Sequence, residues 1–305
     1  MTKPESQSTN PTQPKTVIIL GASGMLGHML VRVLSPHHRV VGTTSSQYNA
    51  GSPLAKLLDR DSWISGIDVR SFNRIDQLVR ETQPDVVINC VGVIKQKMES
   101  SSITDAITIN SLFPHHLANL CQSHNCRLIH FSTDCVFEGT SGIKRASDTP
   151  NATDLYGTTK RLGEIAFGDS ITIRSSIVGA QIVGNESLFQ WAISQKGKSI
   201  KGFTGALYSG LTTMTMAKVI LEIVDNFPQL SGVQQIASEA ITKHDLLCKL
   251  NIALDLSLKI SADNTLVCDR TLDGSEFAHQ TGIEIPTWDE MIEEFASDQN
   301  FYINN

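Results

Sequence analysis

The chain has 305 residues, of which 40% are hydrophobic and 18% charged, with a net charge of −6 and a pI near 5.8. This composition predicts a globular protein with one large core or a core and a smaller lobe, and its acidic balance argues against nucleic acid as a partner. No apolar run approaches the ~20 residues that a membrane helix needs, so we expect no membrane association and a cytoplasmic location.

Residues 1–15 are polar and proline-rich, without the apolar stretch of a signal peptide, and predict a flexible tail. The six cysteines form no CxxC pair, which favours free thiols in a reducing cytosol. Histidines and cysteines between 115 and 130 fit no familiar zinc spacing, so we expect no metal site.

A β-branched strand over residues 16–20 runs into the sequence GASGMLG, and an amphipathic helix follows. In a strand–turn–helix unit of this kind, glycines let the backbone approach a pyrophosphate that lies on the helix N-terminus. A tight turn without a ligand is the alternative. The residues predicted to contact a dinucleotide here are Gly21, Ser23, Gly24, Met25, Leu26 and Gly27.

The second predicted strand, RVVGTTS, ends in three hydroxyl side chains, Thr43, Thr44 and Ser45. An NAD site usually carries an acid at this place, where it binds the ribose 2′-hydroxyl. Hydroxyl groups do not repel a 2′-phosphate and can hydrogen-bond to it. The sequence therefore favours NADP, and NAD stays open.

Two further strands are predicted to reach the cofactor. The segment ISGIDVRS would end a strand at Asp68 and Val69, and the carboxylate would either accept from the adenine amino group or cap the next helix. The segment DVVINCVGVI reads as a buried strand, and its end would place Cys90, Val91 and Gly92 against the middle of the dinucleotide.

One long helix is predicted over residues 104–124. Its buried side would carry Ile107, Leu112, Leu117 and Leu120. Asn110 interrupts this apolar pattern. Although a mid-helix asparagine is usually a surface residue, this one could reach the back of the site around Lys160 and hold a water there.

The strand CRLIHFS ends in the hydroxyl pair Ser132 and Thr133, and a helical segment downstream carries Tyr156 and Lys160. Residues four apart share one helix face, so the phenol and the amine can point into the same cleft. An ammonium that lowers the phenol pKa from about 10 to about 7 would have to supply roughly 4 kcal/mol. By itself the pair could be a solvated helix face, but the glycine turn upstream makes it informative.

Beyond residue 180 the regular strand–helix alternation breaks down. We therefore divide the chain into an NAD(P)-binding domain over 16–180, completed by a returning strand near 233–238, and a substrate-binding lobe over 181–232 and 239–300.

Together, the glycine turn, Asn110, the Ser132–Asp134 run and Tyr156-x-x-x-Lys160 resemble the extended short-chain dehydrogenase/reductases. Within these, the runs IHFSTDCVFEG, LYGTTKRLGE and TIRSSIVG look most like the dTDP-4-dehydrorhamnose reductase family. Cys135 departs from that family, which often has an aromatic residue there. The resemblance implies an α/β fold, a Rossmann-type doubly wound parallel sheet with a small C-terminal lobe, and compatibility with a homodimer.

The resemblance also implies roles. Tyr156 would protonate the C4 oxygen of a nucleotide-diphosphate 4-keto-6-deoxysugar, with Lys160 binding the nicotinamide ribose, Thr133 orienting the keto oxygen and Asn110 organising the proton relay. The residues expected to contact substrate are Ser132, Thr133, Asp134, Val136, Phe137, Tyr156, Lys201 and Tyr208.

Two other functions stay open at this point. An epimerase or dehydratase of the same superfamily is one, although a dehydratase would usually carry a second carboxylate where this chain has Cys135. A non-catalytic, NADP-binding regulatory subunit is the other. The presence of Thr133, Tyr156 and Lys160 counts against it, because binding alone does not require all three.

Overall fold

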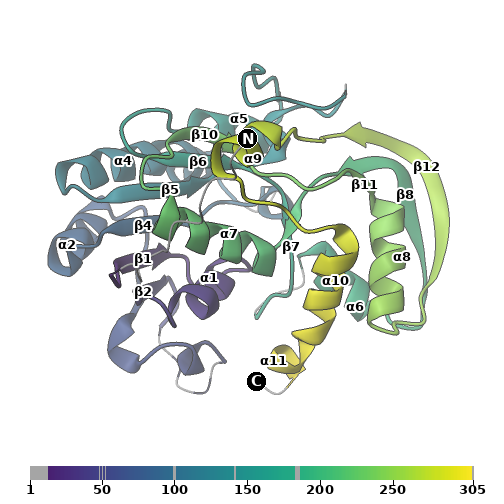
Figure 1. The fold of residues 1–305 in the computed structure, drawn as a ribbon, viewed down its shortest axis with the longest axis horizontal. Coiled ribbons are helices and arrows are strands. Elements are labelled where there is room, and N and C mark those ends of the chain that lie inside the picture. Colours follow the sequence, from purple (N-terminus) through teal and green to yellow (C-terminus); the bar gives the residue numbers. More distant parts are fainter. Residues whose placement is uncertain are drawn as a thin grey trace, which may run out of the picture.

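The computed structural model describes residues 13–47, 49, 51, 53–98, 101–140, 142–182 and 186–303 (Figure 1). Residues 1–12 of the predicted tail lie outside this set. Lys15, which we assigned to the tail, is half-buried, and its amine donates a hydrogen bond to the carbonyl oxygen of Val224.

Seven parallel strands form the central sheet, in the order β10-β6-β5-β4-β1-β2-β3. The strands are β1 (Thr16–Leu20), β2 (Arg39–Thr44), β3 (Trp63–Ser65), β4 (Val86–Asn89), β5 (Arg127–Phe131), β6 (Ile171–Arg174) and β10 (Gly232–Gln235). The strand order reverses between β1 and β4, which makes the crevice at their carboxyl ends the place where such sheets bind ligands. The doubly wound fold predicted from the sequence is confirmed.

Helices cover both faces of the sheet (Figure 1). Because side chains alternate along a strand, Val17 and Ile19 of β1 pack with α1 (Gly27–Leu34) and α7 (Thr213–Asn226). Ile18 and Leu20 pack on the other face, where α2 (Phe72–Thr82) and α4 (Phe113–Ser123) lie. The central strands are therefore apolar throughout, as expected for a sheet buried on both sides.

The predicted helix over 104–124 is not one regular helix. It consists of α3 (Ile103–Ile107), a π-helical turn at Thr108–Leu112 and then α4. A π turn holds more residues than an α turn, so it rotates the apolar stripe relative to what α periodicity predicts. Leu117 is fully buried as expected, but Ile107 and Leu112 are 47% and 52% exposed, and their predicted burial was wrong.

The third strand is also shorter than predicted. It ends at Ser65, because Gly66 has a φ of +71° and turns the chain out of the extended conformation. Asp68 and Val69 therefore follow the strand in a turn before α2, and the side chain of Val69 is buried in the core.

The C-terminal part forms a lobe beside the sheet, at the right of Figure 1. A three-stranded sheet of order β11-β8-β12 is its main feature. Its strands are β8 (Ser199–Tyr208), β11 (Ile241–Thr242) and β12 (Lys259–Asp269), and β7 (Ile177–Val178) pairs with β9 (Leu211–Thr212) nearby. The remaining helices are α5 (Leu155–Leu162), α6 (Leu188–Ser194), α8 (Lys243–Ala253), α9 (Ser275–Thr281), α10 (Trp288–Ser297) and α11 (Gln299–Ile303). Short 3₁₀ turns span Pro53–Lys56, Arg60–Ser62, Lys95–Lys97 and Asp134–Val136. Among the residues described, no helix combines the length and apolarity needed to cross a bilayer.

Candidate active site

The glycine turn connects β1 to α1 at the strand-order reversal. Gly21 has a φ of +76°, and a Cβ there would lie 2.9 Å from a methyl carbon of Val91 at the end of β4. A Cβ on Gly27 would lie 2.2 Å from the carbonyl oxygen of Gly21. The amides of Ser23, Met25 and Leu26 donate no hydrogen bond to any described residue. These amides can therefore bind an anion at the N-terminus of α1.

Two alanine substitutions separate the folding of this turn from its binding role. We expect Gly27→Ala to lower the free energy of unfolding by about 1–3 kcal/mol, because the clash is with backbone that cannot move aside. Gly24→Ala should cost much less stability, since its Cβ would lie 3.3 Å from the Gly21 carbonyl oxygen, which needs to shift by only a few tenths of an ångström. It should weaken dinucleotide binding by filling the exposed side of the turn. Thermal unfolding and cofactor titration of both variants check this, and equal behaviour of the two would contradict it.

The hydroxyl groups at the end of β2 have different partners. The Thr43 side chain is buried, and its Oγ1 accepts from the Gly21 amide at 3.3 Å, so this residue supports the turn. Thr44 Oγ1 lies 2.9 Å from Ser46 Oγ and 3.5 Å from Ser23 Oγ. Ser45 is exposed. Ser46 was missed by the sequence analysis, and it completes a hydroxyl cluster with the polarity that a 2′-phosphate requires.

Asp68 does not cap the next helix as one alternative predicted, and its contact with the adenine amino group stays a prediction. Its carboxylate accepts from the Arg70 amide and guanidinium at 2.7–3.0 Å, which lowers its pKa. The N-cap position of α2 belongs to Ser71. Arg70 also bridges to Asp105 at 2.9 Å, so the turn after β3 is tied to α3.

Lys160 is buried beneath the end of β4. Its Nζ donates to the carbonyl oxygen of Phe131 at 2.6 Å, and a Cβ on Gly92 would lie 3.9 Å from it. Burial lowers the pKa of this amine to about 8, although the negative charge of Glu164 opposes the shift. The half-buried thiol of Cys90 lies close to it, and burial raises the pKa of that thiol. Gly92 itself is exposed, so the amine lies directly beneath a residue at the surface.

Tyr156 lies on the first turn of α5, which Asp154 caps by accepting from the Gly157 amide at 2.9 Å. Burial raises the pKa of the phenol above its usual value, and Cys135 adds to the increase while the Thr133 hydroxyl opposes it. The expectation that Lys160 lowers this pKa to about 7 is wrong for the protein alone. The Lys160 amine is turned toward the Phe131 carbonyl, and burial outweighs its influence on the phenol.

The residues after β5 divide into a polar pair and a set of core residues. Thr133 Oγ1 donates to Asp134 Oδ1 at 3.0 Å and accepts from the Cys135 amide at 3.1 Å. Val136 and Phe137 are 0% and 1% exposed and pack against Leu272. Their predicted contact with substrate was wrong, because the 3₁₀ turn directs both side chains into the core.

Ser132 was also predicted to contact substrate, but its hydroxyl donates to Glu164 Oε1 at 2.7 Å. Glu164 in turn forms a two-point ion pair with Arg174, with both N–O distances at 2.8 Å. Both charged side chains are at least nine-tenths buried. This network lies behind Lys160 and supplies the negative charge that partly offsets the burial of its ammonium.

Asn110 sits in the π turn and is completely buried. Its Oδ1 accepts from the Val93 amide at 2.8 Å, and its Nδ2 donates to the Val93 carbonyl at 3.0 Å and to Thr159 Oγ1 at 3.2 Å. The side chain therefore joins the segment after β4 to α5. Asn110 is a positioning residue for Gly92 and Lys160, and its side-chain donors and acceptor are already used by the protein.

The two lobe residues predicted to contact substrate lie at opposite ends of β8. Tyr208 is buried at the end nearer the site, where the charges of Asp134 and Cys135 influence its pKa. Lys201 is 73% exposed and pairs with Asp263 at 3.2 Å. Seven residues of strand separate the two, which is about 23 Å. The structure therefore does not bring Lys201 to the site.

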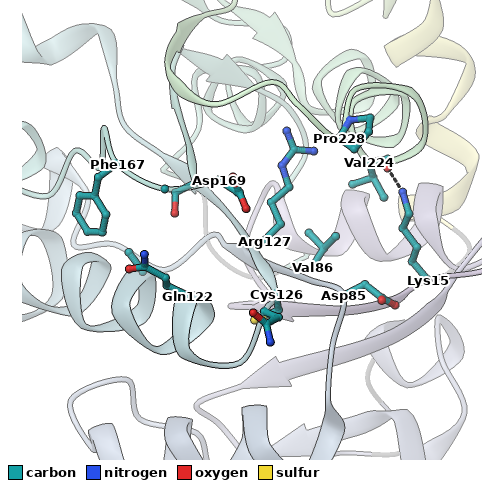
Figure 2. Close-up of a pocket in the computed structure, with 14 residues that line it drawn as sticks. Lys15, Asp85, Val86, Gln122, Cys126, Arg127, Phe167, Asp169, Val224 and Pro228 are labelled. Atoms are coloured by element: carbon teal, nitrogen blue, oxygen red, sulfur yellow. Dashed lines mark hydrogen bonds between the residues drawn. The ribbon is translucent and has the colours of Figure 1, made fainter.

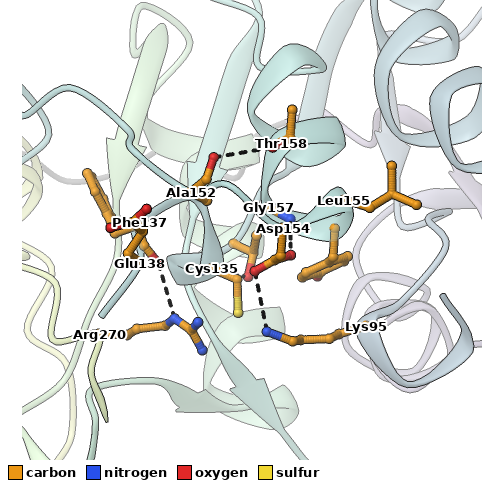
Figure 3. Close-up of polar contacts among 12 residues, drawn as sticks. Lys95, Cys135, Phe137, Glu138, Ala152, Asp154, Leu155, Gly157, Thr158 and Arg270 are labelled. Carbon is orange, nitrogen blue, oxygen red and sulfur yellow. Dashed lines mark hydrogen bonds and ion pairs between the residues drawn. The ribbon is translucent and has the colours of Figure 1, made fainter. Parts of the chain in front are cut away.

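Figure 3 shows a cation that the sequence analysis missed, Arg270, which follows β12. Its Nε donates to the Phe137 carbonyl at 3.1 Å, and the charges of Cys135, Asp134 and Asp154 help to raise its pKa. Lys95 lies across from it and pairs with Asp154 at 3.5 Å. The two cations therefore lie on either side of Cys135 (Figure 3). Contacts between distant segments bring Arg270 here, the pairing of β12 with β8 and the bridge of Asp269 to Thr140, so no local pattern could have indicated it.

A cavity of about 460 Å³ lies at the other end of the strands, beside the amino ends of β4, β5 and β6 (Figure 2). Its charged groups are used by the protein. Asp85 accepts from the Thr16 amide at 2.7 Å, and Arg127 donates to the carbonyl oxygens of Ile223 and Leu230. This cavity is separate from the glycine turn and from Tyr156, and none of the predicted site residues lines it. Among the described residues, no cluster of three potential metal ligands occurs.

A Rossmann sheet, a glycine turn and a Tyr-x-x-x-Lys helix beside a strand-end threonine define an extended short-chain dehydrogenase/reductase. Within that class, the chain belongs to the family described as the RmlD substrate binding domain, whose model matches residues 15–243.

Individual relatives agree with this assignment. The chain is 30% identical over 239 residues to a probable low-salt glycan biosynthesis reductase of Haloferax volcanii, covering 74% of this chain and 76% of that protein. It is 29% identical over 150 residues to dTDP-4-dehydrorhamnose reductase of Streptomyces griseus, covering 49% of this chain and 43% of that protein, less than half of its length. The solved dTDP-4-dehydrorhamnose reductase of Bacillus anthracis, in complex with NADP, has the same fold, with a TM-score of 0.76 at 19% identity over 94% of this chain and 100% of that one.

Proposed function

We propose that this protein is a reductase that uses NADPH to reduce the C4 keto group of a nucleotide-diphosphate 4-keto-6-deoxysugar, in the biosynthesis of a glycan precursor. One set of contacts supports the proposal. Lys160 bonds to the Phe131 carbonyl at the end of β5 and lies beneath Gly92, next to Val91, which borders the glycine turn, and the Thr133 hydroxyl interacts with the Tyr156 phenol. The names of the relatives, which are reductases of glycan and deoxysugar biosynthesis, support the reaction class.

The cofactor assignment rests on the residues present. The unused amides of Ser23, Met25 and Leu26 fit a pyrophosphate, and the hydroxyl cluster of Thr44 and Ser46 fits a 2′-phosphate better than a carboxylate would. NAD stays open because hydroxyls also bind a 2′-hydroxyl. The solved relative that holds NADP supports the preference. When bound, the dinucleotide supplies the hydride.

The protein's own groups handle the proton. The raised pKa keeps the Tyr156 phenol protonated at neutral pH, so it can donate to the developing alkoxide at C4. Lys160, still largely charged at pH 7, would hydrogen-bond to the nicotinamide ribose and stabilise the phenolate that forms. Thr133 would rotate its hydroxyl from Asp134 toward the keto oxygen, while the Cys135 amide keeps Thr133 in place.

We assign Arg270 and Lys95 to the substrate diphosphate. Their guanidinium and ammonium groups lie on either side of Cys135, and phosphate is an anion that both groups bind well. We expect Arg270→Met to raise the KM for the sugar nucleotide about tenfold or more, with little change in the Kd for NADPH. Arg270→Lys should restore part of the loss. Steady-state kinetics with both variants checks this, and an unchanged KM in Arg270→Met would contradict the assignment.

The experiment that tests the proposal is a substrate panel. Purified protein is incubated with NADPH or NADH and with dTDP-, UDP-, GDP- and CDP-linked 4-keto-6-deoxysugars, and cofactor oxidation and product mass are followed. A product two mass units heavier than the substrate supports the reductase. A product of unchanged mass that separates from the substrate by chromatography would indicate an epimerase, and cofactor binding without turnover would indicate a regulatory subunit. A dehydratase would instead release water from a 4-hydroxy sugar nucleotide, which is included in the panel.

The proposal extends to assembly and location. Ile103, Ile107 and Leu112 are exposed along α3 and the π turn, which supports a homodimer through this face. Sedimentation velocity distinguishes dimer from monomer. All six cysteines are free thiols, which supports a reducing compartment such as the cytoplasm.

A further inference from the structure

The C-terminal end of the chain packs on the helix that follows the glycine turn. Arg32 of α1 forms two hydrogen bonds with the Asp298 carboxylate, at 2.7 and 2.6 Å. The Arg32 guanidinium also lies over the Phe301 ring, 3.9 Å from its centroid. Both charged side chains are more than four-fifths buried, and paired charges with such geometry hold two elements together more firmly than an exposed pair does. Residues 298–302 are therefore fixed against α1.

Beside this ion pair, Tyr302 reaches a buried histidine of α1. His28 is 0% exposed, with Nδ1 2.9 Å from the Gly24 carbonyl oxygen and Nε2 2.8 Å from the Tyr302 hydroxyl. A carbonyl oxygen can only accept, so Nδ1 must carry the hydrogen. Burial lowers the pKa of the ring to about 4, so the ring is neutral at pH 7 and its Nε2 accepts from the Tyr302 O–H. The Gly24 carbonyl thus requires this tautomer, and the O–H that Tyr302 donates to Nε2 adds to its stability.

The hydrogen bond from His28 Nδ1 to the Gly24 carbonyl affects the peptide that joins Gly24 to Met25 in the glycine turn. In a trans peptide the carbonyl and the following N–H point in opposite directions. The Gly24 carbonyl accepts from the His28 backbone amide at 3.1 Å and from the His28 ring at 2.9 Å, and the two bonds together hold it toward α1. The Met25 N–H of the same peptide is therefore directed away from the helix, where the amide has no described acceptor. A hydrogen bond to a carbonyl also polarises its amide and makes the N–H a stronger donor.

We propose that Tyr302 and His28 are positioning residues for the pyrophosphate-binding turn, so that the C-terminal segment 298–302 sets the affinity for the dinucleotide. The inference rests on the proposed function, because it requires a dinucleotide at this turn. It adds that a residue 281 positions beyond Gly21 controls the orientation of the Met25 amide through one histidine tautomer.

The test begins with Tyr302→Phe, which removes the hydroxyl alone. We expect the Kd for NADPH, measured by fluorescence titration at pH 7, to rise about threefold to tenfold, the range that the loss of one hydrogen bond produces. The kcat at saturating NADPH should stay the same. Nitrogen-15 NMR of the histidine rings should show His28 protonated at Nδ1 in the wild type and shifted toward Nε2 protonation in the variant.

A His28 variant distinguishes a positioning role of the Tyr302 hydroxyl from a role in packing alone. His28→Asn keeps an N–H donor close to the place of Nδ1, where an asparagine can bond to the carbonyl four residues back, and it removes the link to Tyr302. Whatever Kd for NADPH the His28→Asn variant has, we expect Tyr302→Phe to change it no further in that background. Asp289→Asn, on the exposed side of α10, serves as a control for the C-terminal fold.

Each outcome decides the matter. An unchanged Kd in Tyr302→Phe, or an equal increase in the His28→Asn background, would overturn the inference while leaving the proposed function intact. A wild-type protein that binds neither NADPH nor NADH would overturn both. A change in the Kd that disappears in the His28→Asn background, together with the shifted tautomer, supports the assignment.

Discussion

Tyr156→Phe is expected to lower kcat by about 10²–10⁴-fold, the contribution typical of a positioned general acid, while the Kd for NADPH changes by less than about threefold. The ring stays in place on the first turn of α5, and only the proton donor is lost. Because the phenol pKa is raised by burial, the wild type holds this proton over the whole neutral range. The difference between the two proteins should therefore be nearly independent of pH from 6 to 8. Single-turnover oxidation of NADPH measures it without interference from product release.

A second pair of variants controls for the geometry of the pocket. Thr133→Val removes the hydroxyl that would orient the keto oxygen and also the acceptor of the Cys135 amide, whereas Thr133→Ser keeps both. We expect the serine variant to retain most of the wild-type rate and the valine variant to lose one to two orders of magnitude. A Tyr156→Phe protein with wild-type turnover would remove the phenol from the mechanism, whatever the threonine variants do.

The parts of the fold that the sequence predicted well are those that local patterns determine. Four β-branched residues before GASGMLG identify β1, and the helix pattern after it identifies α1. The interrupted pattern at Asn110 was noticed, but a π turn has no periodicity of its own in so short a segment. Regular α spacing was therefore extended through it, and the burial of Ile107 and Leu112 was predicted wrongly.

The parts that failed depend on contacts between distant segments. Ser132 looked available for substrate because nothing local indicates that Glu164, 32 residues later, takes its hydroxyl. Lys201 was chosen for its charge, although the direction of β8 carries it away from the site. Arg270 was missed for the opposite reason, since the pairing of β12 with β8 and the bridge of Asp269 to Thr140 bring it beside Phe137. Charge and hydroxyl content can thus be read from a sequence, but the direction in which a side chain points requires the fold.

Lys160→Met is expected to lower kcat/KM by two orders of magnitude or more and, at the same time, to leave the fold at least as stable as the wild type at pH 7. Burial lowers the pKa of Lys160 in the folded protein to about 8, from 10.5 in the unfolded chain. Between these values the unfolded chain binds the proton that the folded protein releases, so the free energy of unfolding rises with pH. Below pH 8 the buried ammonium therefore costs about 3 kcal/mol relative to pH above 10.5.

Methionine removes that cost and fills the same volume, but it leaves the Phe131 carbonyl without its donor, a loss of about 1–3 kcal/mol. The net effect at pH 7 should lie between zero and about 2 kcal/mol of added stability. Urea unfolding at pH 7 and pH 10 measures it, and the advantage of the variant should shrink at the higher pH.

The loss of the Lys160 proton also predicts how kcat/KM of the wild type changes at alkaline pH. As pH rises through about 8, Lys160 loses the charge that supports the phenolate and its third N–H, so kcat/KM should fall with one proton lost. Lys201→Met removes an exposed ammonium far along β8. It should change neither the free energy of unfolding nor the fall of kcat/KM at alkaline pH. If Lys160→Met were several kcal/mol less stable than the wild type at pH 7, the amine would be a structural support of β5. A buried charge that weakens the fold, in contrast, is retained because the reaction needs it.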